Sequence, residues 1–148
     1  MKRYVLAPRV RLEMVRDADA RYARAPIRQA ADVFRFLREE VALWERERFL
    51  VLALDGRHRA IGLDEVSVGS LSASLVHPRE VFKALILANA AAFILAHNHP
   101  SGDASPSKED REITGRLKQA ADLMGISLLD HIVLTAEGFH SFRDAGDL

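Results

Sequence analysis

The feature that most constrains the fold of this chain is a short, wholly apolar segment, Ala92 to Ala96, that leads directly into a polar loop. A run of this length without a polar residue on either face is typical of the central strand of a sheet. The loop that follows, His97 to Pro106, is rich in proline, serine, glycine and aspartate. We therefore predict a sheet whose middle strand ends at a group of polar side chains.

Helical and strand patterns surround this segment. Apolar residues at three-to-four spacing predict helices, two of which begin at proline, and Asp55-Gly56 predicts a hairpin turn. In chain order, we expect a helix from Pro26 to about Trp44, strands at 49–54 and 60–68, a helix from Pro78, the strand at 92–96, a helix from about Ser107 to Met124, a strand at 126–134 and a short strand near 139–142. The predicted fold class is α/β (α+β), with a mixed central sheet flanked by helices.

Composition limits the chemistry that is available. The 148 residues suit one domain with a core of its own, and 21 basic residues balance 21 acidic ones, which does not indicate a strongly basic nucleic-acid module. The chain has no cysteine. Disulfide scaffolds, cysteine-bound zinc, iron–sulfur clusters and thiol nucleophiles are therefore excluded, so any metal must be held by His, Asp or Glu.

The N-terminal segment differs from the rest of the chain, because the first 28 residues carry eight basic and three acidic side chains. We assign 1–25 to a basic arm with one strand, where Val10, Leu12 and Met14 alternate with other residues, and 26–148 to the main domain. The arm is either a solvated segment or a weak contact for phosphate or a partner, so nucleic acid stays possible. Oligomeric state is not readable.

The sequence predicts a cytoplasmic location without membrane contact. Its longest apolar run, Ala90 to Ala96, is far shorter than the roughly 20 residues that a membrane-spanning helix needs. The charged residues near the start leave no apolar core for a signal peptide.

The segment with the clearest chemistry joins the central strand to the next helix. His97 and His99 are two residues apart, so in extended backbone they point to the same side, roughly 6–7 Å apart. Asp110 lies in the first turn of the helix, three residues before Ile113, on the face that must pack on the sheet. A buried carboxylate beside two histidines would be costly without a counterion, and two histidines with one carboxylate form a known catalytic zinc arrangement.

Each of these residues also has a structural interpretation. Ser107 and Asp110 fit a variant of the capping box at a helix N-terminus, and His97 and His99 could bond to loop backbone. The combination of all three groups at one edge of the sheet favours the metal site.

This segment resembles the JAMM motif of MPN-type metalloproteases. The motif has His-x-His, seven residues, Ser, two residues and Asp, and the sequence matches it without a gap from His97 to Asp110. The stretches 76–82, 89–92, 96–103 and 128–131 resemble the RadC-like branch, and the resemblance extends from about Glu45 to Leu148. It implies a single JAMM/MPN-type domain of cytidine-deaminase-like architecture, with Zn²⁺ held by His97, His99 and Asp110.

The resemblance also implies an activity. The family has an upstream glutamate followed by one residue and an aromatic, which Glu47-Arg48-Phe49 matches, with Glu45 as the nearest competitor. Glu47 would be the general base and Ser107 would stabilise the oxyanion, giving hydrolysis of a peptide or isopeptide bond in a peptide or protein substrate of unknown identity. His131 recurs in the RadC pattern, and we expect it to pack behind the ligands.

A second hypothesis is a non-catalytic DNA- or protein-interaction domain associated with DNA repair or mobile elements. The basic arm and the RadC resemblance support it, since RadC proteins are often named for DNA repair. RadC proteins commonly carry an N-terminal helix-hairpin-helix region. The residues before Glu45 are too few for it and lack its Gly-rich hairpins, so we expect a short, stand-alone RadC-like domain.

Overall fold

The computed structural model describes residues 25–69 and 76–148. The basic arm predicted for 1–25, with its strand, thus lies outside the described residues except for residue 25. No helix in the described part is long and apolar enough to cross a membrane. The elements are α1 (Ala30–Val41), β1 (Arg48–Leu54), β2 (Ala60–Val68), α2 (Pro78–Leu87), β3 (Ala92–Asn98), α3 (Lys108–Met124), β4 (Ser127–Leu134), β5 (Phe139–Ser141) and α4 (Phe142–Ala145).

The strands form one mixed sheet in the order β2-β1-β3-β4-β5. β3 and β4 are parallel, whereas the other neighbouring strands are antiparallel. All seven residues of β3 are buried, which confirms the prediction that this apolar segment is a central strand. The mixed sheet with flanking helices confirms the predicted fold class.

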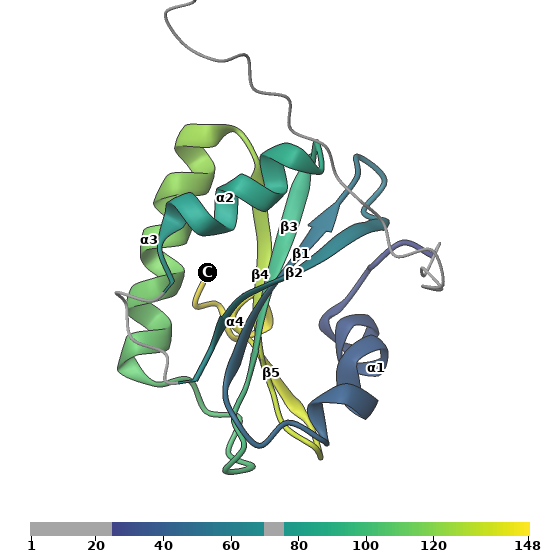
Figure 1. The fold of residues 1–148 in the computed structure, drawn as a ribbon, viewed down its shortest axis with the longest axis vertical. Coiled ribbons are helices and arrows are strands. Elements are labelled where there is room, and N and C mark those ends of the chain that lie inside the picture. Colours follow the sequence, from purple (N-terminus) through teal and green to yellow (C-terminus); the bar gives the residue numbers. More distant parts are fainter. Residues whose placement is uncertain (1–24, 70–75) are drawn as a thin grey trace, which may run out of the picture.

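Helices cover both faces of the sheet, with α1 on one side and α2 and α3 on the other (Figure 1). Alternation along the strands divides the apolar side chains between two cores. Leu52 and Ile94 face the core of α1, whereas Val51, Phe93 and Leu95 face the core of α2 and α3. Because side chains alternate along a strand, His97 comes out on the same face as Leu95, toward α3.

The first helix begins later than the sequence predicts. Pro26 does not open it but forms an isolated bridge to Arg59, and the N–H of Ile27 donates to the His58 carbonyl over 2.8 Å. These contacts attach the extended segment to the β1–β2 hairpin. Helix α1 starts only at Ala30, where Asp32 accepts the backbone N–H of Gln29, and it ends at Val41 rather than Trp44.

Candidate metal centre

The end of β3 positions the two histidines. His97 lies in the strand and is fully buried, with no solvent exposure. His99 follows the strand directly, and its N–H donates to the Leu134 carbonyl at the end of β4 over 2.8 Å. This bond continues the parallel pairing of β3 and β4 by one step, so both imidazoles are held on the side of α3.

The first turn of α3 supplies the carboxylate. Ser107 caps the helix, since its hydroxyl accepts the N–H of Asp110 over 3.1 Å, and its own N–H donates to Asp110 Oδ2 over 2.7 Å. Ile113 and Leu117 bury the same face of the helix against the sheet. Asp110 is therefore both a capping-box residue and an inward-facing acid, because one carboxylate can serve the helix end and still face the histidines.

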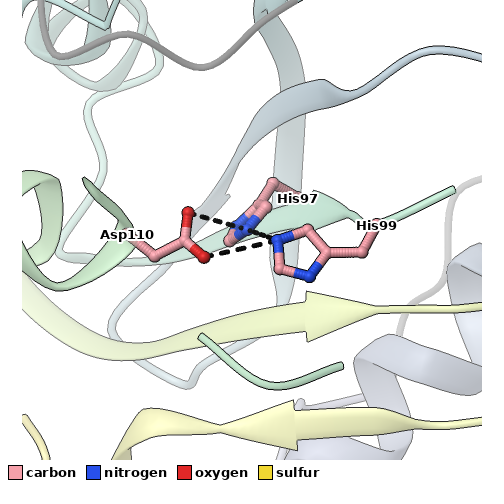
Figure 2. Close-up of side chains that lie close together, drawn as sticks. All are labelled: His97, His99 and Asp110. Carbon is pink, nitrogen blue, oxygen red and sulfur yellow. Dashed lines mark hydrogen bonds and ion pairs between the residues drawn. The ribbon is translucent and has the colours of Figure 1, made fainter. Parts of the chain in front are cut away.

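Figure 2 shows the Asp110 carboxylate facing both imidazole rings. His97 Nε2 lies 3.1 Å from Asp110 Oδ1, and His99 Nε2 lies 3.3 Å from Asp110 Oδ2. The two Nε2 atoms are 3.0 Å apart. In tetrahedral zinc sites with bonds of about 2.0–2.1 Å, ligand atoms are roughly 3.3 Å apart, so the three residues have the spacing of a metal site.

The proton positions support the same conclusion. His99 Nδ1 lies 2.7 Å from the Asp103 carbonyl oxygen, which can only accept, so Nδ1 carries a hydrogen. In a neutral ring, His99 Nε2 then has a bare lone pair directed toward the carboxylate oxygens of Asp110. Lone pairs that face each other at this distance repel unless a cation or a proton lies between them. The donor set therefore fits a divalent metal ion.

Asp110 and His99 shift each other's pKa in opposite directions. Burial acts to raise the pKa of Asp110, but its close contacts with the His97 and His99 imidazoles outweigh burial and hold that pKa well below its usual range. The Asp110 carboxylate in turn raises the pKa of His99 above its ordinary value, although burial opposes this. The site thus keeps the carboxylate charged and attracts a positive charge to His99.

This arrangement predicts that protons and metal compete for His99. The affinity for a metal ion should fall as the pH drops through the raised pKa of His99, starting above the ordinary imidazole value of about 6.5. The fold stability of metal-free protein should show the opposite pH dependence. The protonated His99–Asp110 pair stabilises the fold at low pH, and this stabilisation is lost as the pH rises through the raised pKa of His99. Zinc titrations and urea unfolding at several pH values measure both, and a zinc affinity that stays constant from pH 8 to about 6 would contradict the assignment.

Glu47 lies beside this centre, and Glu45 is farther from it in the strand register. Phe49 pairs with His97 across β1 and β3, so continuing the antiparallel register by two residues places Glu47 next to His99. Its negative charge contributes to the raised pKa of His99. Glu47 is half-buried, whereas Glu45 is exposed, and this favours Glu47 of the two candidates.

Asn98, between the two histidines, holds the segment that carries Glu47. Its Oδ1 accepts the N–H of Arg48 over 2.7 Å, and its Nδ2 donates to the Arg46 carbonyl over 3.0 Å. The Glu47 carbonyl accepts the N–H of Gly69 on the other side over 2.8 Å. Sequence reasoning assigned no role to Asn98, since its partners lie about 50 residues earlier in the chain.

Asn98→Ala should destabilise the protein. The substitution leaves the Arg48 N–H and the Arg46 carbonyl without their side-chain partner, and we expect the free energy of unfolding to fall by about 1–3 kcal/mol. Urea unfolding measures this. Gln119→Ala, which removes an exposed amide on α3, is the matched control and should change little. Equal losses in the two variants would contradict the role of Asn98.

A second layer of polar residues lies behind the His97–His99–Asp110 cluster. His131 on β4 is fully buried, and its Nε2 lies 2.8 Å from His97 Nδ1. Desolvation lowers the pKa of His131 well below its ordinary value, so its ring is neutral. Its Nδ1 contacts the hydroxyl of Thr114 at 2.6 Å. Sequence reasoning expected His131 to pack behind the ligands but missed Thr114, although a polar residue four positions after Asp110 in an apolar helix face was a signal.

Comparisons with known proteins find a family model and several relatives that match this chain. The family model of the RadC-like JAB domain matches residues 27–147. A UPF0758 protein of Rubrobacter xylanophilus is 49% identical over 125 residues, which is 84% of this chain and 55% of the relative. UPF0758 proteins of Thermotoga maritima and Symbiobacterium thermophilum are 49% and 54% identical, over 78% and 77% of this chain and 52% and 49% of their own lengths.

The chain spans about half the length of these relatives. Residues 27–147 of this chain, which the family model matches, contain all the described helices and strands and all three residues of the His97–His99–Asp110 cluster. The chain belongs to the RadC-like JAB domain family.

Proposed function

We propose that this domain is a zinc-dependent hydrolase that cleaves a peptide or isopeptide bond. The observation that carries the proposal is the convergence of His97 Nε2, His99 Nε2 and the Asp110 carboxylate, one ligand atom from each lying within 4.8 Å of the others. Two histidines and a carboxylate leave a fourth position for water or substrate, as in catalytic rather than structural zinc sites. Nitrogen ligands from imidazole suit zinc better than magnesium or calcium.

A bound zinc ion would supply a Lewis acid and lower the pKa of a water molecule to about 7. The residues of the chain would supply the rest of the chemistry. Glu47, next to His99 in the strand register, would accept a proton from the attacking water and pass it to the leaving nitrogen. Breaking an amide bond needs this second transfer because an unprotonated amine anion is a poor leaving group.

Ser107 would stabilise the negative charge that develops on the substrate carbonyl. Its hydroxyl oxygen accepts the Asp110 N–H, so the hydroxyl hydrogen is not used in the helix cap and can be donated. Its position before the first turn of α3 places it three residues from a metal ligand. Such donors are typically worth 10²–10³-fold in rate in acyl transfer.

The test uses the full chain loaded with zinc and a mixture of peptides that includes lysine-linked isopeptides. New amino groups are detected by mass spectrometry after labelling. We expect chelator-sensitive cleavage that returns when zinc is restored and is absent in Glu47→Gln. Wild-type protein with one bound zinc that releases no more amines than Glu47→Gln would reject the proposal.

A further inference from the structure

His131 has two polar contacts that together define the position of its ring proton. The imidazole is fully buried and stacked on Phe142 with ring centroids 4.8 Å apart, and it packs edge-to-face with Phe49 with ring centroids 5.6 Å apart. Its two nitrogens contact His97 and Thr114. A fully buried imidazole whose two hydrogen-bond partners are a second imidazole and a hydroxyl is neutral, because a buried charge would need a counterion, so one nitrogen donates and the other accepts.

Thr114 decides which nitrogen donates. Its hydroxyl lies 2.6 Å from the carbonyl oxygen of Asp110, one helical turn earlier, and 2.6 Å from His131 Nδ1. A carbonyl oxygen can only accept, so the single hydroxyl hydrogen of Thr114 is directed to Asp110. Thr114 must then accept from His131, and the ring proton of His131 lies on Nδ1.

The tautomer of His131 in turn sets the tautomer of His97. With its proton on Nδ1, His131 offers a bare Nε2, so His97 Nδ1, at 2.8 Å, must donate to it. His97 Nε2 is then left without a hydrogen, and this atom faces Asp110 Oδ1 and His99 Nε2. We infer that Thr114 and His131 are positioning residues, which fix the tautomer of His97 so that its Nε2 lone pair is directed into the metal centre.

The role in metal binding rests on the proposed function, whereas the tautomer does not. Burying the polar side chains of Thr114 and His131 costs free energy of folding, whereas an apolar residue at 114 would simply continue the buried face formed by Ile113 and Leu117. Histidine ligands are usually oriented by a hydrogen bond to the other ring nitrogen, and loss of that partner typically weakens metal binding 10–100-fold. Here the partner that orients His97 is a second histidine, His131. The Thr114 hydroxyl keeps the ring proton of His131 on Nδ1.

The experiment reads the tautomers directly, using ¹H–¹⁵N NMR of histidine side chains in metal-free full-length protein at about pH 8, above the ordinary imidazole pKa. In the wild type, we expect His97 and His131 both to carry the proton on Nδ1. In Thr114→Val, which has nearly the same shape without the hydroxyl, His131 and His97 should show Nε2–H forms, and zinc affinity should fall 10–100-fold. Thr114→Ser keeps the hydroxyl and should restore both properties.

Wild-type protein with the His97 proton on Nε2 overturns the inference without any variant, even if Thr114→Val fails to fold. Unchanged tautomers and zinc affinity in a folded Thr114→Val would overturn it as well. If the wild type shows the expected tautomers but binds no zinc, the proposed function fails while the relay of Thr114 and His131 is upheld.

Discussion

Asp110→Asn is expected to lower zinc affinity by more than the roughly 100-fold that loss of a partner behind a ligand costs. Asp110 is the single negative charge among the three proposed ligands, and its two oxygens face His97 Nε2 and His99 Nε2. Asparagine has nearly the same shape, and its amide oxygen can still accept the Ser107 N–H that closes the helix cap. The fold should therefore persist while the charge that attracts the metal is lost. Competition with a chromogenic chelator measures the affinity.

Asp122→Asn is the matched control. Asp122 lies on the same helix, but it is exposed and pairs with Lys118 over 2.8 Å on the surface. Zinc affinity in this variant should equal that of the wild type. If Asp110→Asn bound zinc as tightly as Asp122→Asn, the cluster at the end of β3 would not be the metal centre.

Glu47→Gln is expected to remove hydrolysis while leaving zinc in place. Glu47 is not among the three residues whose ligand atoms converge, so the metal should remain. Glutamine cannot take a proton from water, and general acid–base catalysis by a positioned side chain typically contributes 10²–10⁴-fold. We expect a loss of kcat of that size on any substrate that the zinc-loaded wild type cleaves, measured together with zinc content.

Glu45→Gln separates the two upstream candidates. Glu45 is exposed and lies two residues earlier, so its loss should leave kcat unchanged. A large loss of kcat in Glu45→Gln, with normal kcat in Glu47→Gln, would mean that Glu45 is the general base and that the assignment of Glu47 from the strand register is wrong.

The part of the site that could be predicted is the part that depends on local geometry. Alternation along a strand places His97 and His99 on one side, and the first turn of a helix places Asp110 three residues before the buried Ile113. The central position of β3 followed from the wholly apolar segment Ala92 to Ala96, and the structure confirms it. These inferences need no knowledge of which strands are neighbours.

The remaining features depend on tertiary pairing. His131 reaches His97 because β3 and β4 are parallel with an irregularity between Phe93 and Ile94, which shifts the register. Asn98 reaches Arg46 and Arg48 because β1 is antiparallel to β3. The periodicity of apolar residues along a single strand predicts neither of these registers. The late start of α1 has the same origin, since contacts with the β1–β2 hairpin hold Pro26 outside the helix.

The most direct test of the account is the metal content of wild-type protein and His97→Ala, measured side by side by elemental mass spectrometry on untagged chains offered zinc at neutral pH. His97 is fully buried and supplies one of the three converging atoms. The account predicts about one zinc per wild-type chain, as for a mononuclear site with one open position, and loss of that zinc in His97→Ala. Wild-type protein without zinc, or equal zinc in both proteins, would contradict the metal centre proposed here.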